Sequence, residues 1–417
     1  MTNTIPTMTE SQVLTNTMIK QLDDNVIWSN FANREFQGKM SYGNTVKVTE
    51  FPIIRGGRST LAERTNVIPG TTFTSSLKDM SVEQMIQDRV ELSVEESSLD
   101  AINTKEAIVS EFGRAIAQAH DRHVATVAIS NAAASNQLGK ADVYAPTAGT
   151  VYGKYGEIAA KFGENNIEGR IAIMVSYDHY YNDIKGSDIL DGVNDGLLMR
   201  LQDKLTTTGG RAPNLANGAL KGMINGMFVY CTNNTPFRQK LTLDTNPTAD
   251  DTIVLSVKNE ETDTTDAITW TYKASASGVA EITIGANATE TQVNTRNAYA
   301  GTGTGFVDVS AANRKVLDTM EIRLEAFVAN VSYVFGAQSK AIDLAETFTA
   351  VTNIFGTKAE VITALDPVAI NFVESISRFG IEKADNGFYD NIMYKNLYQA
   401  AVLGRNNKRI VTLDIAR

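Results

Sequence analysis

The sequence has little of the chemistry that covalent cross-links and metal sites require. Its 417 residues include one cysteine, Cys231, so no intrachain disulfide can form, and only three histidines. No apolar run approaches the roughly 18 residues that a membrane-spanning helix needs. The opening MTNTIPTMTESQ lacks a basic segment followed by an apolar one. We therefore expect synthesis in a cytoplasm without a standard export signal.

Positive charge is also in short supply. The 38 Lys and Arg residues face 48 Asp and Glu residues, which gives a net charge of -10 and argues against a surface built to neutralise nucleic-acid phosphates. Apolar residues make up 43% and charged residues 21%, which is typical of a folded, soluble chain. The length predicts two or three packed units.

The usual nucleotide and nucleophile motifs are missing. The sequence has no G-x-x-x-x-G-K-[ST] and no G-x-S-x-G, and GTGTGF at 301–306 lacks the G-x-G-x-x-G spacing. Cys231 ends an apolar run, where a cysteine is more often a core residue than a nucleophile. We predict no catalytic residue, no cofactor and no metal, and hence no enzyme.

Two half-exposed strands are predicted early in the chain, at NTVKVTEFPII (44–54) and at RVELSVEE (89–96), because apolar and polar residues alternate there. Between them lies a long stretch rich in Gly, Arg, Thr and Ser, which is typical of an extended loop that binds something. Its basic cluster is Arg55, Arg58 and Arg64. A solvated or intersubunit contact is favoured for it over nucleic-acid binding.

Residues 104–131 are predicted to form one long helix, with Asn103 and Glu106 resembling a capping box. On a helical projection His123 lies within the apolar stripe and His120 lies beside it, whereas Asp121 points the opposite way. The aspartate therefore cannot share a site with the histidines. A metal would need a third ligand such as His179, so a packed helical face or a subunit contact is favoured.

The rest of the chain has an interrupted α/β pattern. Helices are predicted at 152–163 and 188–205, and buried strands at 170–177 and 222–232. From 238 to 315 short strands in a Thr-rich composition predict a β-rich insertion, in which Trp270 and Tyr272 share a strand face and enter one core. After it we predict a helix at 339–355 and a closing strand at 409–416.

In this order, the segments resemble the major capsid protein of tailed bacteriophages, with the Hong Kong 97-like fold. The resemblance spans nearly the whole chain outside the insertion. It is carried by five segments: NREFQGKMSYGNTVKVTEFPI, DRVELSVEESSLDAINTKEAIVSEFGRAIAQAHDRHVATVAIS, GRIAIMVSYDHYYND, LKGMINGMFVYCTNN and LYQAAVLGRNNKRIVTLDIA.

The resemblance implies an α+β fold in six parts. These are an N-terminal arm (1–40), an extended loop with flanking strands (41–95), a peripheral domain built on the spine helix (96–149), an axial domain (150–237), the β-rich insertion (238–315), and a return to the axial and peripheral domains (316–417).

It also implies a virion protein that self-assembles, as hexamers and pentamers, into an icosahedral shell around double-stranded DNA without sequence-specific binding. Scaffolding, portal and decoration proteins are possible partners, and assembly would take place in the host cytoplasm. Candidate intersubunit contacts are Arg55, Arg58, Arg64, Glu91, Glu95, His120 and His123. The alternatives are an encapsulin-like compartment shell and a phage tail or adhesion protein.

Overall fold

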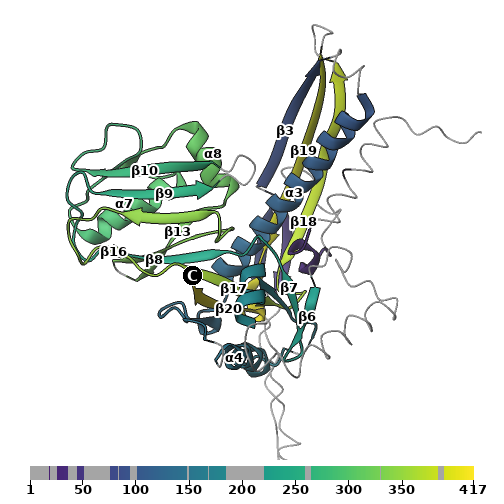
Figure 1. Cartoon of the computed structure of the whole chain (residues 1–417), viewed down its shortest axis with the longest axis horizontal. Coiled ribbons are helices and arrows are strands. Elements are labelled where there is room, and N and C mark those ends of the chain that lie inside the picture. Colours follow the sequence, from purple (N-terminus) through teal and green to yellow (C-terminus); the bar gives the residue numbers. More distant parts are fainter. Residues whose placement is uncertain are drawn as a thin grey trace, which may run out of the picture.

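The protein has a mixed α+β structure, as expected from the sequence, with one long helix and several sheets (Figure 1). No helix in the part of the chain that is described is long and apolar enough to cross a membrane. The computed structural model describes residues 18, 26–35, 45–50, 76–82, 84–93, 101–147, 150–167, 169–184, 220–258, 264–328, 330–383 and 389–417.

The long helix α3 (Ala101–Asn131) lies along a three-stranded antiparallel sheet (Figure 1). The strand order is β18 (Asn371–Lys383), β19 (Tyr389–Ala401) and β3 (Gln84–Ser93). We call α3 and this sheet the arm unit. The predicted long helix is confirmed, but it begins at Ala101, so Asn103 is helical and the predicted capping box is wrong.

The period of two in β3 decides which of its faces meets the helix. Ile86, Val90 and Leu92 pack into the core that α3 forms with β19. The intervening Gln87, Arg89 and Glu91 are exposed on the other face. The alternation in the sequence thus correctly predicted a half-exposed strand.

Strands β1 (Thr45–Glu50) and β2 (Ser76–Ser81) pair with each other in a two-stranded antiparallel sheet. The strand predicted at 44–54 is confirmed in β1. No third strand joins this pair within the described part of the chain. Met80, at the end of β2, is buried against Val373 of β18, which ties the base of the hairpin to the arm unit.

A second unit is built around a mixed sheet. It contains β5 (Ala172–Val175), β6 (Leu220–Ile224), β7 (Met227–Cys231), β17 (Ala359–Leu365) and β20 (Ile410–Ala416), with the short β4 (Gln137–Leu138) pairing β20. Helix α4 (Val151–Glu164) packs against it through its buried Tyr155, Ile158 and Phe162. The predicted helix at 152–163 and the buried strand at 170–177 are confirmed.

The apolar run predicted as one strand at 222–232 forms two strands instead. Asn225 and Gly226, at φ 48° and 81°, form the turn between β6 and β7. Two consecutive positive φ angles are typical of a type I′ hairpin turn, for which Asn-Gly is the favoured pair. The helix predicted at 188–205 lies outside the described residues.

The insertion is a β-rich unit with its own core. One sheet has the order β12 (Phe306–Val307), β11 (Glu281–Thr283), β10 (Thr265–Lys273), β9 (Thr252–Lys258) and β15 (Ile342–Glu346). Helices α7 (Ala288–Ala300) and α8 (Ala311–Thr319) belong to the same unit. Trp270 and Tyr272 are both fully buried in its core, as predicted, and the ring of Trp270 stacks on that of Tyr299 at 4.6 Å.

The structure corrects the predicted end of the insertion at residue 315. β15 pairs with β9, and the core of the insertion includes Ile322, Ile342 and Phe355. The helix predicted at 339–355 is also wrong, because that segment forms β15 and β16 (Ile354–Phe355). Ile342 and Leu344 point into the core at a spacing of two, so pairing with β9 decides the structure.

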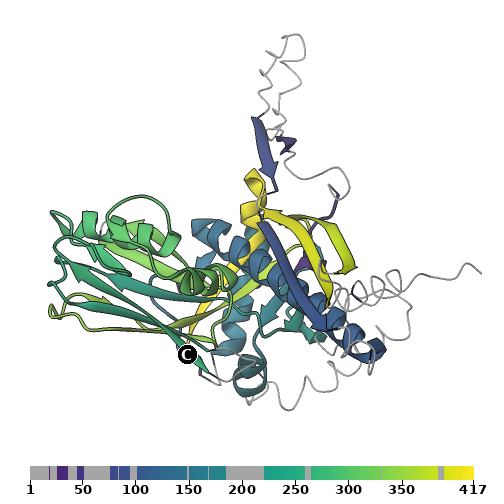
Figure 2. The ribbon, with the colours of Figure 1, turned by 90° about the horizontal axis from the view of Figure 1, so that it is seen from above.

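The insertion is joined to the second unit by a continuous sheet. β8 (Phe237–Thr242) pairs with β14 (Val331–Gly336), which pairs with β13 (Arg323–Val328). β8 also pairs with β17, where Arg238 lies opposite Ala359 and Phe237 opposite Glu360. Figure 2 shows the insertion, in green, to one side of α3 and its sheet.

Candidate functional site

The polar stretch His120 to His123 on α3 makes contacts in three directions. His120 faces β18 and β19, Asp121 faces residues 27–29, and His123 faces the insertion. The prediction that Asp121 does not share a site with the histidines is confirmed. This stretch of α3 therefore holds three separate parts of the chain.

Asp121 anchors residues 26–31 to α3. Its fully buried carboxylate accepts hydrogen bonds from the backbone N–H groups of Ile27 at 3.0 Å, Trp28 at 2.9 Å and Ser29 at 3.3 Å. These residues open the short 3-10 helix η1 (Ser29–Phe31), whose free N–H groups need an acceptor. Burial raises the pKa of Asp121 to about 7, although the three N–H donors act in the opposite direction.

Trp28 completes this anchor. Its side chain is fully buried, and its indole N–H donates to the backbone oxygen of Asn234 at 3.1 Å. Phe31 packs edge-on against the ring of Tyr230 of β7, at 4.5 Å between centroids. Where it is described, the N-terminal segment predicted as an arm thus docks on its own chain.

His120 is a buried neutral imidazole. Its Nε2 lies 3.3 Å from Asn396 Oδ1, and its Nδ1 lies 3.3 Å from the carboxylate of Glu374, which also pairs with Arg34. Burial lowers the pKa of His120 to about 3, and the nearby Arg34 lowers it further. The contact with Glu374 is therefore not an ion pair near neutral pH.

His123 links α3 to the insertion. Its Nδ1 lies 2.7 Å from a carboxylate oxygen of Glu321, in the turn between α8 and β13. Both side chains are at least 93% buried within one chain, where groups of the same chain receive them. The intersubunit role of His120 and His123 stays a prediction.

A buried ion pair joins three elements behind α3. Arg238 of β8 donates to both carboxylate oxygens of Asp414 on β20 at 2.9 Å, and to the backbone oxygen of Ile129 at 3.3 Å. Ile129 lies in the last turn of α3, where the unpaired carbonyl groups favour a cation. Burial raises the pKa of Asp414, and the charges of Arg238 and Lys140 offset part of that rise.

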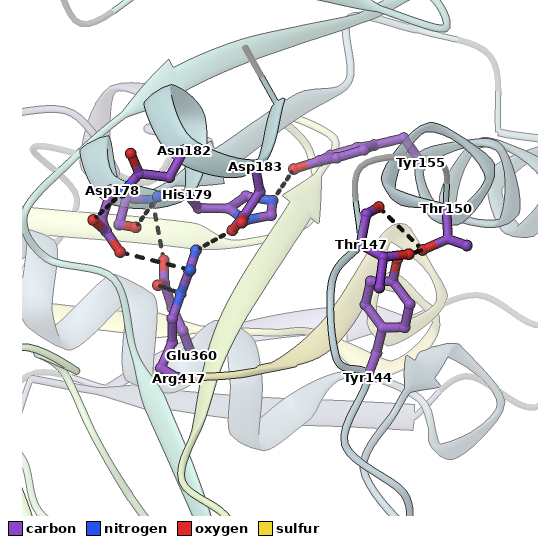
Figure 3. Close-up of polar contacts among 11 residues, drawn as sticks. Tyr144, Thr147, Thr150, Tyr155, Asp178, His179, Asn182, Asp183, Glu360 and Arg417 are labelled. Carbon is purple, nitrogen blue, oxygen red and sulfur yellow. Dashed lines mark hydrogen bonds and ion pairs between the residues drawn. The ribbon is translucent and has the colours of Figure 1, made fainter. Parts of the chain in front are cut away.

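A second polar cluster surrounds Arg417 (Figure 3). Its guanidinium group binds Asp183 at 2.7 Å and Glu360 at 3.0 Å, and lies 3.6 Å from Asp178. Asp183 also accepts from Nδ1 of His179 at 2.7 Å, and His179 Nε2 lies 2.9 Å from the hydroxyl of Tyr155. Burial acts to raise the pKa of Asp183, but His179 and Arg417 together hold it below its ordinary value.

This cluster fixes one turn of chain against the sheet. His179 and Asp183 lie in the π-helix η4 (His179–Ile184), and Asp178 directly precedes it. Glu360 lies on β17, and Tyr155 lies on α4. The arginine is surrounded by three carboxylates and bound by two of them. We interpret the cluster as structural.

Figure 3 also shows a hydroxyl cluster where α4 begins. Thr147 and Thr150 lie 2.7 Å apart through their hydroxyl groups, and the hydroxyl of Tyr144 contacts Thr150. Thr150 is the N-cap residue of α4, but its side chain makes no capping hydrogen bond and donates instead to the backbone oxygen of Thr147 at 3.2 Å. Sequence reasoning missed both clusters; the members of the one around Arg417 are far apart in the chain, whereas Tyr144, Thr147 and Thr150 lie within seven consecutive residues.

The remaining predicted contact residues have different outcomes. Glu91 is exposed on β3, where it accepts from Arg89 of the same strand. Arg55, Arg58, Arg64 and Glu95 lie outside the described residues. Cys231 is buried, and burial raises its pKa to about 12, so its thiol is a core group. Within the described ranges, no group of three or more His, Cys, Asp or Glu is placed to hold a metal.

Comparison with known proteins gives similarity at the level of solved structures only. No family model matches the chain, and no curated protein matches it. The chain is similar to a structure from Mycobacterium phage Che8, with 12% identity, a TM-score of 0.44 and coverage of 93% of this chain and 90% of that one. It is also similar to the capsid of Ralstonia phage GP4, with 10% identity, a TM-score of 0.48 and coverage of 94% of this chain and 88% of that one. A third similar structure is the capsid of the cyanophage P-SCSP1u, with 11% identity, a TM-score of 0.46 and coverage of 94% of this chain and 88% of that one.

Proposed function

We propose that this chain is a structural subunit that self-assembles into an icosahedral shell enclosing a phage genome, with the Hong Kong 97-like fold. The observation that carries the proposal is the β1–β2 hairpin. It is a pair of six-residue strands without a third strand among the described residues. An isolated two-stranded hairpin is at best marginally stable in water, so this one needs a partner surface.

The arm unit supports the same proposal. A helix of 31 residues lies on strands of 10 to 13 residues, and the unit extends away from the body of the chain (Figure 1). The mean helix in globular proteins has about 11–12 residues. A long unit with one covered face suits a subunit that is completed by its neighbours.

The parts of the chain correspond to the resemblance as follows. The arm unit would be the peripheral domain and the sheet with α4 the axial domain. Residues 41–95 would be the extended loop, which lies over a neighbouring subunit, with its flanking strands, of which β3 is shared with the arm unit. Residues 1–40 would be the N-terminal arm. The insertion would extend from 238 to about residue 355 instead of 315.

Charged contacts between subunits would involve the extended loop. Arg55, Arg58 and Arg64 are candidates for binding a neighbour, with Glu91 and Glu95 as possible acidic partners. Glu91 is exposed on the face of β3 that α3 does not cover, which supports its candidacy. The net charge of -10 suits a shell that encloses DNA without binding its phosphates tightly.

The shell would consist of hexamers and pentamers, assembled in the host cytoplasm with scaffolding, portal and decoration proteins as possible partners. The subunit would act by geometry and not as an enzyme. The ion pairs of Arg238 with Asp414 and of Arg417 with Asp183 and Glu360 are all made within one chain, which supports a structural role.

The full chain, expressed with and without candidate scaffolding proteins, should form closed particles visible by electron microscopy. A triple charge reversal of Arg55, Arg58 and Arg64 to Glu should reduce particle yield strongly. The matched control reverses Lys315 and Lys340, which are exposed on the insertion, and should leave the yield unchanged. Monomers under all conditions would contradict the proposal, fibres or tubes would favour a tail protein, and particles filled with a protein cargo would favour a compartment shell.

A further inference from the structure

The insertion carries a row of partly or fully exposed side chains, three of them apolar, across four neighbouring strands. Val328 of β13 pairs with Val331 of β14, Val331 pairs with Thr242 of β8, and Thr242 pairs with Ile354 of β16. Directly paired residues in antiparallel strands point to the same face of a sheet. Val328 is 56% exposed and Ile354 50%, so both ends of the row face solvent.

The opposite face of the same strands is buried. Ser332, Leu241 and Phe355 are each the next residue along their strands and lie in or beside the core of the insertion. The core-facing side chains of these strands are therefore accounted for, and the row lies on the other face of the sheet. We call Val328, Val331, Thr242 and Ile354 the apolar row.

A second line of side chains continues the apolar row on the same face. Phe327, at a bulge in β13, is 47% exposed and contacts the ring of Tyr333 at 5.2 Å. The ammonium group of Lys140 lies over both rings, at 5.4 Å from Phe327 and 5.2 Å from Tyr333. Lys240 pairs with Tyr333 and is partly exposed. The apolar row is thus flanked by the ring of Phe327 and by Lys240, whereas Lys140 is largely covered and lies 3.9 Å from Glu325.

The face is held rigidly relative to the rest of the subunit. Tyr333 donates to the backbone oxygen of Lys140 at 2.7 Å. The same strands are fixed to α3 and β20 by Arg238, and to α3 by the contact of His123 with Glu321. A surface that is fixed at several points loses little conformational entropy when it binds.

We propose that the apolar row and Phe327 dock onto a second copy of this chain. This inference rests on the proposed function, because a shell places identical neighbours at a fixed distance. Lys240, which is partly exposed beside the row, favours an acidic partner, and the chain itself carries a net charge of -10. The row is too small for the roughly 800 Å² per partner of a standard stable interface. That size suits a weak contact that is repeated over many subunits, because many weak contacts together can stabilise the whole assembly.

The first test replaces the two most exposed residues of the row. The double variant Val328→Ser, Ile354→Ser should keep the melting temperature of the unassembled subunit, because both side chains are half exposed or more. The concentration needed for assembly should rise about tenfold or more. The control Val279→Ser changes a 71% exposed valine elsewhere on the insertion and should leave assembly unchanged.

The second test identifies the occupant. A photoreactive benzoylphenylalanine in place of Phe327 should, in assembled particles, give a cross-linked product of twice the chain mass that contains two copies of this chain. A product with another protein, or no product, would overturn the inference, as would normal assembly of the double variant. If the unaltered chain forms no particles at all, the proposed function fails instead.

Discussion

The insertion and the arm unit differ in how far apart in the chain their contacting residues lie. The core of the insertion is apolar and comes from residues 237 to 355, with Trp270, Tyr272 and Tyr299 at its centre. The arm unit also has an apolar core, between α3, β3 and β19, and depends in addition on polar contacts between distant parts of the chain. Asp121 binds Trp28 across 93 positions, His120 meets Asn396 across 276, and Arg34 meets Glu374 across 340.

This difference predicts how each region responds to damage. An apolar core loses stability in proportion to the volume that is removed. A buried polar network loses stability when one partner is removed, because the remaining group stays buried without a hydrogen bond or counter-charge. The insertion should therefore tolerate polar surface changes, and the arm unit should be sensitive to single polar substitutions.

The largest effect is expected in the core of the insertion. Trp270→Ala removes a fully buried ring that stacks on Tyr299, and should cost about 3–5 kcal/mol of unfolding free energy. Urea unfolding followed by circular dichroism would measure it. Val279→Ala, at a 71% exposed position, is the control and should change stability by less than about 0.5 kcal/mol. Equal effects of the two changes would show that the insertion lacks this core.

The next largest effect is expected at the junction between the two regions. Arg238→Ala leaves Asp414 buried without its main counter-charge, which should cost about 3 kcal/mol. The double variant Arg238→Met, Asp414→Leu removes both charges and should recover most of that loss. The same urea measurement tests it, and a double variant as unstable as the single one would refute the account of a buried ion pair.

A smaller effect is expected where residues 26–31 dock. Asp121→Ala removes the acceptor of three backbone N–H groups, and should cost about 2 kcal/mol and release Trp28 to solvent. The chain has two tryptophans, so Trp270→Phe leaves Trp28 as the only indole fluorophore. In that background Asp121→Ala should shift the emission to the red. An unchanged spectrum would mean that Asp121 does not hold this segment.

The smallest effect concerns pH. His120 has a folded pKa of about 3, below its unfolded value of 6.5, so its contribution to stability is lost as the pH falls below 6.5. Asp121 has a folded pKa of about 7, above its unfolded value of 3.8, so its contribution rises as the pH falls from 7 toward 3.8. Between pH 6.5 and 5 each change is about 1.5–2 kcal/mol, and the two oppose each other.

When either residue is replaced, the pH dependence of stability that the other residue causes should become measurable. His120→Gln should become more stable relative to the unaltered chain on going from pH 6.5 to 5, and Asp121→Asn should become less stable. Urea midpoints at the two pH values provide the measurement. Parallel pH dependence in all three proteins would contradict the opposing slopes.

The sequence predicted elements whose signal is local. Alternation identified β1 and β3, apolar residues at helical spacing identified α3, and the spacing of two placed Trp270 and Tyr272 in one core. It failed for residues 339–355, where pairing with β9 outweighs a helix-like spacing. It also missed the turn at Asn225 and Gly226, because the apolar run continues on both sides of it.

The candidate contact residues show where sequence reasoning ends. The orientation of Asp121 away from the histidines followed from helical geometry alone. The partners of His120 and His123 did not, because Asn396 and Glu321 lie 276 and 198 positions away. The apolar row was also hidden, since its four members come from four strands and become neighbours only through pairing.

The most direct test of the central claim is an electron micrograph of the purified full chain under assembly conditions. The account predicts closed, roughly spherical particles of uniform size that are built from copies of this chain. Monomers alone, across ionic strengths and with candidate scaffolding proteins present, would contradict it.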